Sequence, residues 1–540
     1  MRPNRSLLLL GSFGPLRYSL PLRAHRVNRS KNSRRLSTRC VVVGAPEIPE
    51  HLPHHVGGEK VFGAAESAGL TKVYPATGQA LCSVPIAGSE EIERAVAAAE
   101  TALSSWSALP GAERSLVLAR AAQALRDTHG EMARLEVLDT GKPLVEAEAD
   151  TSAADAFQWF SSLAASACVE GRHVPLGAAG FGYTRREPLG VCAGITAWNY
   201  PVQGAAWKVA PALACGNAVV LKPSPLAPLT ANRLAEVLEA AGVPRGLFNV
   251  VHGDASTGAA LAVHPRVRKV SLTGSVQTGA RVAGAAGAAL KPATMELGGK
   301  SPLLIFDDAD LDEAVAAAMM ANFCTQGEVC SNGTRILVAR AAHAELVRRL
   351  VARAARIRLG DPLELDTRMG ALISADHLHA SRAAVARYKA EGCRAALDLS
   401  AGPAPGALRG ALAGGFWFGP VVFDHVPAGA ALLREEVFAP VVAVQPFDSE
   451  AEALALANDC DFGLAGGVFT RDLARAHRVA AALDAGTVWI NEYNPAPAPL
   501  PFGGRRRSGF GKEGGIEAIE HYSQVKSVYC ATAPVWCHFE

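Results

Sequence analysis

The amino-acid sequence predicts an α/β protein with a doubly wound parallel sheet, followed by a second α/β region. Three observations support this prediction. The chain has 540 residues, of which 49% are hydrophobic and 19% charged, so it is long enough for two or three folded domains. Between residues 187 and 298, strand-like apolar runs alternate with helical stretches of about 10–15 residues. A further apolar run at Pro302–Phe306 begins the same alternation again.

The first 40 residues differ in composition from the rest of the chain. They hold nine Arg and one Lys, and the first acidic residue of the chain is Glu47. An Arg-rich, Ser-containing segment without acidic residues is typical of organelle transit peptides. We therefore predict a transit peptide-like segment over residues 1–40 and a location in the mitochondrial matrix. A disordered tail on a cytoplasmic protein, or a wrongly chosen start codon, is the alternative.

The remaining composition excludes several classes of partner. Without residues 1–40 the chain has 43 basic and 51 acidic residues, a balance that does not favour nucleic acid. No apolar run approaches the roughly 20 residues that a membrane-spanning helix requires, so no membrane is expected. The 11 cysteines include no CxxC pair, and Cys324 and Cys330 have no histidine nearby in the sequence. We therefore expect no metal, and reduced thiols.

The segment before residue 187 is mainly helical. Residues 41–90 have the pattern of a poorly defined lead-in with a turn-rich stretch. From Ser89 to about Ala167 the pattern is helical and rich in alanine, with breaks at Pro110 and at Gly141–Pro143.

The region 187–298 contains the clearest alternation of strands and helices. Predicted in chain order are a strand at Gly190–Trp198, a helix through Trp207 and Leu213, a strand at Asn217–Lys222, a helix at Thr230–Ala241, and strands at Leu247–Val251 and Lys269–Leu272. Such alternation indicates a parallel sheet with right-handed crossovers, and hence a nucleotide-binding type of domain.

A second α/β region is predicted from Lys300 to about residue 507. After it, Tyr522–Tyr529 alternates enough to form a strand, but it has no obvious partner in its own domain. Because an unpaired strand at a chain end often completes a sheet across a subunit interface, we predict an oligomer.

Two glycine motifs look like phosphate-binding loops but lack the required context. Gly509–Gly514 matches GxGxxG, yet a basic, proline-rich loop precedes it instead of a predicted strand. Gly299–Ser301 resembles the end of a P-loop, but Thr294 occupies the position of its first glycine. We expect neither motif to bind phosphate.

Cys330, in the sequence QGEVCSNG, and Glu296, in the sequence MELGGK, are candidates for covalent catalysis. Such a cysteine can be a nucleophile, and a carboxylate beside it in the fold can activate water to release the product. Taken alone, Cys330 is more typical of a small buried apolar residue and Glu296 of a solvated carboxylate. The apolar neighbours Met295 and Leu297 indicate burial, which would raise the pKa of Glu296.

Three polar segments follow predicted strands. Thr273–Gly279 opens a helix, so its N–H groups could bind a phosphate; the alternative is an ordinary turn with Ser275 as N-cap. Lys222 ends the second strand and could bind a ribose, or it is a solvated surface lysine. Asn199 ends the first strand and could donate its amide to an oxyanion, or it is simply a turn residue.

Taken together, these segments resemble the aldehyde dehydrogenase superfamily from about residue 60 to 530. Four motifs in matching order carry the resemblance: Met295–Ser301, Gln326–Cys330, Glu435–Phe438 and Pro501–Gly504. Within the family, the sequence is most similar to the enzymes that oxidise 4-trimethylaminobutyraldehyde and betaine aldehyde. This narrower similarity rests on Tyr183–Gly190, Met320–Phe323, Ser331–Arg335 and Tyr493–Asn494.

The resemblance implies an aldehyde dehydrogenase-like arrangement of domains and a homotetramer or homodimer. The implied parts are the N-terminal part of the cofactor-binding domain (41–165), an oligomerisation hairpin (166–186), the doubly wound cofactor-binding domain (187–298), a catalytic α/β domain (299–507) and a small β oligomerisation tail (508–540).

The resemblance also implies oxidation of an aldehyde through a thiohemiacetal and a thioester. Cys330 would attack the aldehyde, its N–H and the Asn199 amide would hold the oxyanion, and Glu296 would activate water. NAD would be the cofactor, bound by Ile195, Trp198, Lys222, Ser224, Gly274, Ser275, Thr278, Gly279, Leu297, Glu436 and Phe438. Many family members exclude the 2′-phosphate of NADP with a glutamate where this chain has Pro225, so NADP is not excluded here.

The residues expected at the substrate are Tyr200, Trp207, Trp159, Glu492 and Phe502. Aromatic faces and a carboxylate would bind a trimethylammonium group, although each residue could equally be a plain core or surface position. A general aliphatic or amino-aldehyde dehydrogenase is the alternative. An acylating enzyme that uses coenzyme A usually lacks the glutamate present here as Glu296. The presence of Cys330, Asn199 and Glu296 also disfavours a non-catalytic binding protein.

Overall fold

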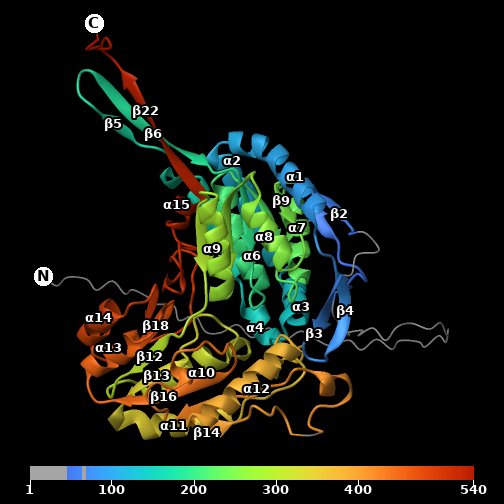
Figure 1. The fold of residues 1–540 in the computed structure, drawn as a ribbon, viewed down its shortest axis with the longest axis vertical. Coiled ribbons are helices and arrows are strands. Elements are labelled where there is room, and N and C mark those ends of the chain that lie inside the picture. Colours follow the sequence, from blue (N-terminus) through green and yellow to red (C-terminus); the bar gives the residue numbers. More distant parts are fainter. Residues whose placement is uncertain (1–45, 64–68, 405, 540) are drawn as a thin grey trace, which may run out of the picture. The chain divides into compact units, whose positions relative to one another are not determined.

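A computed structural model describes residues 46–63, 69–404 and 406–539 (Figure 1). The predicted transit peptide-like segment, residues 1–40, lies outside the described residues. None of the described helices is long and apolar enough to cross a membrane.

The predicted parallel sheet is confirmed. Five neighbouring strands run parallel in the order β9-β8-β7-β10-β11, and a helix follows each of the first four in the chain. The strands and helices alternate as β7 (Val191–Ile195), α6 (Pro201–Ala214), β8 (Ala218–Lys222), α7 (Leu229–Ala240), β9 (Phe248–Val250), α8 (Ala255–Val263), β10 (Val267–Thr273), α9 (Val276–Ala288) and β11 (Ala293–Glu296).

Helices cover both faces of this sheet. Helices α6 and α7 contact each other and α2 (Gly111–Asp127), whereas α8 contacts α9 and α1 (Ser89–Ala108) (Figure 1). Every residue of β7 and β8 is consequently buried, which explains why these strands appear in the sequence as continuous apolar runs without alternation.

The strand order places a binding crevice between β7 and β10. From β7 the chain proceeds to β8 and β9 on one side, and then crosses back to β10 and β11 on the other side. In open parallel sheets, ligands bind at the carboxyl ends of the strands where the order reverses in this way. The segments after Ile195 and after Thr273 therefore meet at one edge of the sheet.

Residues 41–90 are not a poorly defined lead-in, as the sequence predicted. The described part of this segment forms two antiparallel hairpins: β1 (His54–Val56) with β2 (Glu59–Val61), and β3 (Leu70–Tyr74) with β4 (Gln79–Val84). Strand β1 pairs with β9, so that the first hairpin extends the parallel sheet at its edge. These strands have only three to six residues, too few for a clear alternating pattern.

The predicted breaks at Pro110 and Gly141–Pro143 are confirmed, and the helical segment has two further breaks. After α1 and α2 come α3 (His129–Thr140), α4 (Leu144–Ala149) and α5 (Ser152–Ala164). Gly141 has a left-handed φ of 79° and ends α3, while Asp150 and Thr151 separate α4 from α5.

The predicted second α/β region is also confirmed. Its sheet has the order β14-β15-β16-β13-β12-β18-β19, and all neighbours except β14 and β15 are parallel. Its strands are β12 (Pro302–Ile305), β13 (Arg335–Ala339), β14 (Arg394–Asp398), β15 (Val421–Asp424), β16 (Val441–Phe447), β18 (Ala465–Phe469) and β19 (Thr487–Ile490). Its helices are α10 (Leu311–Phe323), α11 (Arg340–Ala354), α12 (Ala375–Ala390), α13 (Glu450–Asn458) and α14 (Leu473–Ala482).

The expected C-terminal strand is present, but it does not lack a partner. Strand β22 (Ser523–Ala531) pairs antiparallel along its whole length with β6 (Gly180–Pro188), which also pairs with β5 (His173–Pro175). These three strands form an arm that extends from the helices around them (Figure 1). Strand β22 therefore gives no support of its own to the predicted oligomer, because its partner strand lies about 340 residues earlier in the same chain.

Short strands complete the fold near the C-terminus. Strand β21 (Gly509–Phe510) pairs antiparallel with β11 at the end of the first sheet, and β17 (Phe462–Gly463) pairs with β20 (Arg505–Arg506). Helix α15 (Ala518–Tyr522) contacts α6. Residues beyond 508 therefore contribute to two sheets, while the exact domain boundaries remain predictions.

Candidate active site

The segment that carries Cys330 has an unusual backbone. Helix α10 ends at Phe323, and the next turn contains Thr325, Gln326 and Gly327 with φ of 48°, 53° and 75°. Left-handed φ at a residue other than glycine is uncommon and costly, so surrounding contacts must hold this turn in place. One such contact is the Glu146 carboxylate, whose Oε2 accepts a hydrogen bond from the Thr325 N–H at 2.7 Å.

Two cavities of similar size meet at the three predicted catalytic residues. One has a volume of about 700 Å³ and the other of about 710 Å³. Cys330, Glu296 and Asn199 line both of them. Residues from three distant parts of the sequence, at the ends of β7 and β11 and after α10, are thus brought to one junction. We call the first the cofactor cavity and the second the substrate cavity, after the roles that we assign to them below.

Glu296 is buried at the end of β11 without hydrogen-bond partners. Neither oxygen of its carboxylate has a partner among the described residues. Burial raises the pKa of this carboxyl well above its usual range, and the negative charge of Glu513 raises it further. The positive charges of Lys208 and Lys512 oppose this increase. Most buried polar groups are hydrogen-bonded, so a carboxyl left free at a cavity junction is suited to bind a water molecule or a reacting group.

The Cys330 thiol has a raised pKa. Burial raises it to about 12, and the nearby charges of Glu436 and Glu296 add to this, whereas the backbone N–H groups of Cys330 and Ser331 oppose it. The thiol form therefore predominates at neutral pH in this state of the protein. A nucleophilic thiolate requires that this proton be removed as the sulfur attacks.

The Asn199 side chain is fixed by one hydrogen bond. Its Nδ2 donates to the Glu328 carbonyl at 2.9 Å, two residues before Cys330. An amide nitrogen carries two hydrogens, so one remains to donate toward the cavity junction. This geometry suits an oxyanion donor whose position is coupled to the cysteine loop.

The cofactor cavity lies at the carboxyl ends of the parallel strands, as the strand order requires. Ten of the eleven residues predicted to bind the cofactor line it: Ile195, Trp198, Lys222, Ser224, Gly274, Ser275, Thr278, Leu297, Glu436 and Phe438. Gly279 is the exception. A Cβ at Gly279 would lie 2.3 Å from the Leu297 side chain, so this glycine allows α9 to pack closely behind Leu297 and does not itself face the cavity.

Local hydrogen bonds hold Ser275 and Glu436 in the cofactor cavity. Ser275 is the N-cap of α9, because its Oγ accepts from the Thr278 N–H at 3.3 Å, and it also lines the cavity. Glu436 is held by the Gly299 N–H, which donates to its Oε1 at 3.0 Å. A Cβ at Gly298 would lie 1.9 Å from the Glu436 carboxylate, so only glycine allows this approach.

The sequence did not point to three other polar residues of the cofactor cavity. They are Asp254, Arg281 and His377. His377 Nε2 donates to the Phe438 carbonyl at 2.8 Å, and Phe438 itself has a left-handed φ of 59°. His377 thus stabilises an unfavourable backbone conformation at a predicted cofactor-binding residue. Its helical surroundings carry no motif, and only the tertiary structure brings it to the cavity.

Three of the five residues predicted at the substrate line the substrate cavity: Tyr200, Trp207 and Phe502. The ring centroids of Trp207 and Phe502 are 5.4 Å apart. Tyr200 has the Lys142 ammonium 3.7 Å from its ring centroid, so one face of this ring is already occupied by a cation. The free aromatic surface of the cavity is therefore provided mainly by Trp207 and Phe502.

Trp159 and Glu492 are not among the residues that line this cavity, so the structure does not bring these two predicted residues to it. Trp159 lies one helical turn beyond Asp155 of α5, and its indole N–H donates to the Gly515 carbonyl at 3.3 Å. Glu492 is exposed, and its Oε1 accepts from the Tyr493 N–H at 2.9 Å. The residues of this loop that line the cavity are Asn494, which has a left-handed φ of 75°, and the four residues after it.

Carboxylates of the substrate cavity come from an unexpected segment. Glu146, Asp150 and Asp155, on α4, α5 and the linker between them, line the cavity. No periodicity distinguishes them from the solvated acids common in helices, so they could not be identified from the sequence. Their presence provides the negative charge that Glu492 does not.

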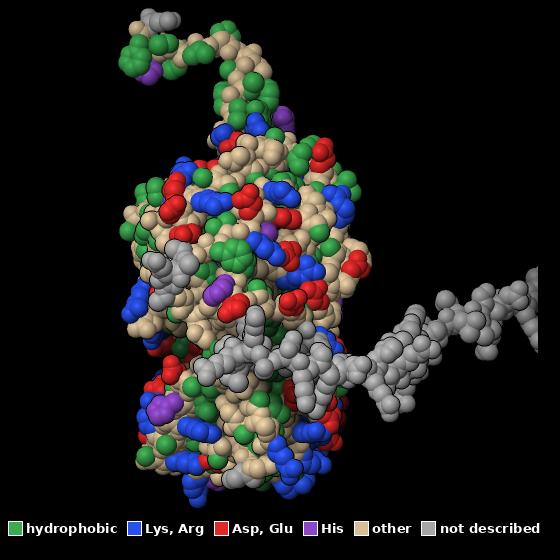
Figure 2. Space-filling view, turned by 90° about the vertical axis from the view of Figure 1, so that its right-hand side faces the viewer, with side chains coloured by type: hydrophobic (Ala, Val, Ile, Leu, Met, Phe, Trp, Pro, Cys, Tyr) green, Lys and Arg blue, Asp and Glu red, His purple; other side chains and the backbone are tan. Residues whose placement is uncertain are grey.

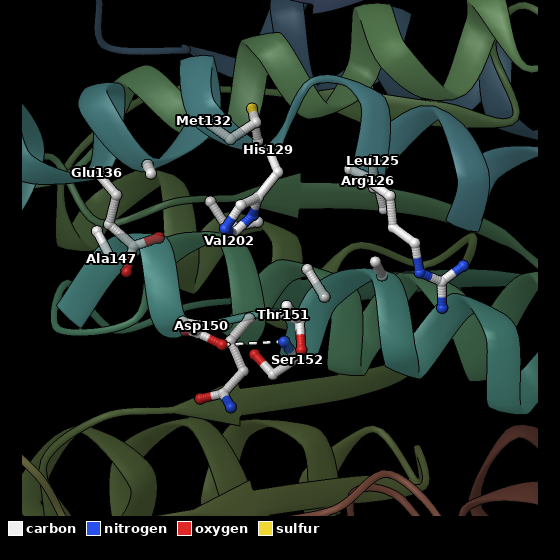
Figure 3. Close-up of a pocket in the computed structure, with 14 residues that line it drawn as sticks. Leu125, Arg126, His129, Met132, Glu136, Ala147, Asp150, Thr151, Ser152 and Val202 are labelled. Carbon is white, nitrogen blue, oxygen red and sulfur yellow. Dashed lines mark hydrogen bonds between the residues drawn. The ribbon is translucent and has the colours of Figure 1, made fainter. Parts of the chain in front are cut away.

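A third, smaller cavity of about 180 Å³ adjoins the substrate cavity (Figure 3). It lies among α2, α3, α5 and α6, and its walls are largely apolar, with Met132, Ala133 and Val202 among them. Asp150, Thr151 and Ser152 line both this cavity and the substrate cavity. The linker between α4 and α5 is therefore a thin partition, braced by the Ser152 N–H that donates to Asp150 Oδ1 at 2.9 Å.

The junction defines a class of protein: an enzyme that works through a covalent cysteine adduct beside a nucleotide-sized cavity. Comparison with known proteins gives the family. The model of the aldehyde dehydrogenase family matches residues 62–528. The chain belongs to this family and is an oxidoreductase that acts on aldehydes.

The similar proteins include several betaine aldehyde dehydrogenases. One from Rhizobium etli is 49% identical over 484 residues, which cover 89% of this chain and 98% of that protein. A betaine aldehyde dehydrogenase from Staphylococcus aureus, solved in complex with NAD⁺, has a TM-score of 0.86 and 36% identity over 91% of this chain and 97% of its own. A putative aldehyde dehydrogenase from Burkholderia cenocepacia has a TM-score of 0.87 and 37% identity over 90% and 99%.

Proposed function

We propose that this protein oxidises a trimethylammonium aldehyde of the betaine aldehyde type to its carboxylate, with NAD as the cofactor. The observation that carries the proposal is the meeting of two cavities at Cys330, Glu296 and Asn199. The relatives named above support the substrate class and the cofactor. The second candidate substrate is 4-trimethylaminobutyraldehyde, which carries the same charged group on a longer chain.

The residues at the junction suit each step of such an oxidation. The Cys330 thiol loses its proton to solvent as its sulfur attacks the carbonyl carbon, and the Asn199 amide and the Cys330 N–H donate to the resulting oxyanion. NAD, held by residues of the cofactor cavity such as Lys222, Ser275 and Glu436, would supply the hydride acceptor, and loss of the hydride from that carbon would leave a thioester on Cys330. Glu296 then takes a proton from a water molecule while the oxygen of that water adds to the thioester carbon. The C–S bond breaks, the carboxylate leaves, and the thiol is regenerated.

The cofactor cavity fits a dinucleotide. Its volume of about 700 Å³ is within the usual range for such ligands. The N-terminus of α9, which begins after its N-cap Ser275, offers backbone N–H groups to a pyrophosphate, and Lys222 offers an ammonium to a ribose. Glu436 and Phe438, near Cys330, suit the nicotinamide ribose.

The substrate cavity suits a quaternary ammonium group. Trp207 and Phe502 present aromatic surface, and Glu146, Asp150 and Asp155 present carboxylates. Lys142 lines the same cavity, but its ammonium is paired with the Glu136 carboxylate at 2.5 Å, which offsets its charge. The local balance of charge therefore favours a cationic substrate.

An isosteric pair of aldehydes tests the substrate. Betaine aldehyde and 3,3-dimethylbutanal differ essentially in the charge of one central atom, nitrogen or carbon. We expect kcat/KM to be at least about tenfold higher for betaine aldehyde, because cation–π and carboxylate contacts favour only the charged one. Equal values would show a general aliphatic aldehyde dehydrogenase. The chain-length preference follows from the same assay with 4-trimethylaminobutyraldehyde.

We also propose a homotetramer or homodimer. Exposed apolar side chains gather along the arm of β5, β6 and β22 (Figure 2), among them Val174, Leu176, Tyr183, Val525 and Tyr529. Such a surface on a projecting sheet is suited to contact a second copy of the chain. Light scattering on the purified protein would give its mass, and a monomer at micromolar concentration would contradict this proposal.

A mitochondrial matrix location is proposed from the composition of residues 1–40. The bacterial relatives named above do not bear on it, and a cytoplasmic location is the alternative. Expression with a C-terminal fluorescent tag in a eukaryotic cell, followed by N-terminal sequencing, would test it. Mitochondrial fluorescence and loss of about the first 40 residues are expected. Diffuse fluorescence with an intact N-terminus would contradict the proposal.

A further inference from the structure

The adenosine end of the cofactor cavity lacks the carboxylate common in this family. The position that often carries a glutamate is Pro225, which lines the cavity beside Ser224. Dinucleotide sites that prefer NAD usually hold the 2′-hydroxyl with an acidic residue, whereas sites for NADP place a cation at the 2′-phosphate. The charged groups of this chain that reach that end of the cavity therefore decide which cofactor it favours.

Lys222 connects this end to the loop between β9 and α8. Its Nζ donates to the Pro223 carbonyl at 2.9 Å and to the Gly253 carbonyl at 3.0 Å. An ammonium has three hydrogens, so one remains for a ribose hydroxyl. The second of these bonds holds the Gly253 backbone against Lys222, and the next residue in the chain is Asp254.

Asp254 places a carboxylate in the same cavity. It lines the cavity with Lys222, Ser224 and Pro225. Its Oδ1 accepts from the Ser256 N–H at 2.8 Å and from the Ser256 hydroxyl at 2.6 Å, so the side chain is fixed as the N-cap of α8. These bonds also lower the pKa of Asp254, which is therefore ionised at neutral pH.

The two charges interact across the cavity wall. Burial lowers the pKa of Lys222 to about 8, and the negative charge of Asp254 opposes this decrease. Arg281 of α9 lines the same cavity, but it is exposed, so water screens its charge more strongly than that of the half-buried Asp254. Asp254 is thus the negative charge at this end, whereas the positive charges are those of Lys222, which the Pro223 and Gly253 carbonyls already hold, and of the exposed Arg281.

We propose that Asp254 is a specificity-determining residue that favours NAD by repelling the 2′-phosphate of NADP. Its carboxylate, in the loop before α8, takes the place of the acidic side chain that is missing at position 225, in the loop after β8. A 2′-phosphate carries about two negative charges at neutral pH and would lie against this carboxylate. The inference rests on the proposed function, because it assigns the cavity to a nicotinamide dinucleotide.

The test compares adenosine ligands that lack the nicotinamide. Calorimetry on the full-length chain would measure the binding of 5′-ADP, of adenosine 2′,5′-bisphosphate, and of 5′-AMP, which differs from the bisphosphate only by the 2′-phosphate. We expect 5′-ADP and 5′-AMP to bind the wild type at least about tenfold more tightly than the bisphosphate. In Asp254→Asn the affinities of 5′-AMP and the bisphosphate should come within about threefold, because asparagine keeps the N-cap of α8 and removes the charge.

Asp310→Asn is the matched control. Asp310 caps α10 in the same way, accepting from the Asp312 N–H at 3.0 Å, but it is not among the residues lining either cavity. This variant should keep the wild-type ratio of affinities. Arg281→Gln should weaken the bisphosphate more than 5′-ADP, which would show that the 2′-phosphate approaches this end of the cavity.

Steady-state kinetics provide a second measurement. The ratio of kcat/KM for NAD to that for NADP should fall at least about tenfold in Asp254→Asn. An unchanged ratio of ligand affinities in Asp254→Asn, a wild-type preference for the bisphosphate, or no binding of 5′-ADP would overturn the inference. If ADP binding behaves as expected but no aldehyde is oxidised with either cofactor, the proposed function fails and the role of Asp254 stands.

Discussion

The two large cavities have nearly equal volumes but are built in different ways. Strand ends and the beginnings of helices form much of the cofactor cavity, after β7, β8, β10 and β11. The substrate cavity is formed largely by side chains from α4, α5, α6 and the cysteine loop. The backbone of a parallel sheet creates a binding edge whatever the side chains are, whereas a cavity between helices depends on each residue that faces it. The first kind of site is therefore more visible in a sequence.

The largest expected effect comes from removing the nucleophile at the junction. Cys330→Ala should decrease aldehyde-dependent NADH formation at least about 10³-fold, because the covalent step is lost while both cavities persist. Absorbance at 340 nm measures this directly. Cys324→Ala is the matched control, since Cys324 lines the substrate cavity only, six residues earlier. It should retain activity within about threefold, and a Cys330→Ala variant that still reduced NAD would exclude the covalent mechanism.

Removing the carboxylate from the same junction should separate the two halves of the reaction. Glu296→Gln should release about one equivalent of NADH per active site in a rapid burst, and then turn over about 10²-fold more slowly or less. The reason is that hydride transfer requires Cys330, whereas hydrolysis of the thioester requires the base. Stopped-flow absorbance would show the burst, and mass spectrometry the acylated cysteine.

The matched control for the base is Glu492→Gln. Glu492 is exposed and bonded to its own backbone neighbour, so its variant should behave as the wild type in both phases. If Glu296→Gln showed no burst and no acyl-enzyme, the role of Glu296 would lie before hydride transfer.

Much of the cofactor cavity was predictable from the sequence. Lys222 and Asn199 follow apolar runs, and Thr273–Gly279 links a strand to a helix, so local patterns alone place them at the carboxyl edge of a sheet. Even there, the sequence missed Asp254 and His377, because only the tertiary structure brings their segments to that edge.

The substrate cavity was predicted less well for a physical reason. Trp159 and Asp155 share a face of α5, but the helix advances about 5.4 Å per turn, and this is enough to take Trp159 past the cavity to Gly515. Glu492 was placed at the substrate by the family resemblance, and the left-handed backbone at Asn491 and Asn494 on either side of it was not foreseen. The acids of the α4–α5 segment carry no local signal, since their role depends on how α4 and α5 pack against the cysteine loop.

An aromatic substitution would sharpen the comparison on the substrate side. Trp207→Leu should decrease kcat/KM for betaine aldehyde about tenfold and for 3,3-dimethylbutanal less than about threefold, because a desolvated cation–π contact contributes about 1–2 kcal/mol only to the charged substrate. Trp159→Leu, outside the cavity, should change both values equally. Thermal unfolding of both variants would separate lost packing from lost recognition. Equal losses in Trp207→Leu would remove the aromatic contact from the explanation.

The smallest expected effect concerns the influence of the Glu436 charge, in the cofactor cavity, on the reactivity of the Cys330 thiol. The pKa of Cys330 is raised to about 12, partly by the negative charge of Glu436, whose own pKa burial raises to about 7. The thiolate is the reactive form, so alkylation of Cys330 by iodoacetamide should accelerate with pH up to at least pH 10. Below about pH 7, Glu436 is mostly neutral and Glu436→Gln should match the wild type. Above pH 7 the wild type acquires a charge that disfavours the thiolate, so the variant should react about threefold faster.

Peptide mapping by mass spectrometry would assign the label to Cys330. Glu435→Gln is the control, because Glu435 is exposed and pairs with Arg387 at the surface. A variant that differed from the wild type equally at pH 6 and pH 9 would indicate a change in access to the thiol and not in its charge environment.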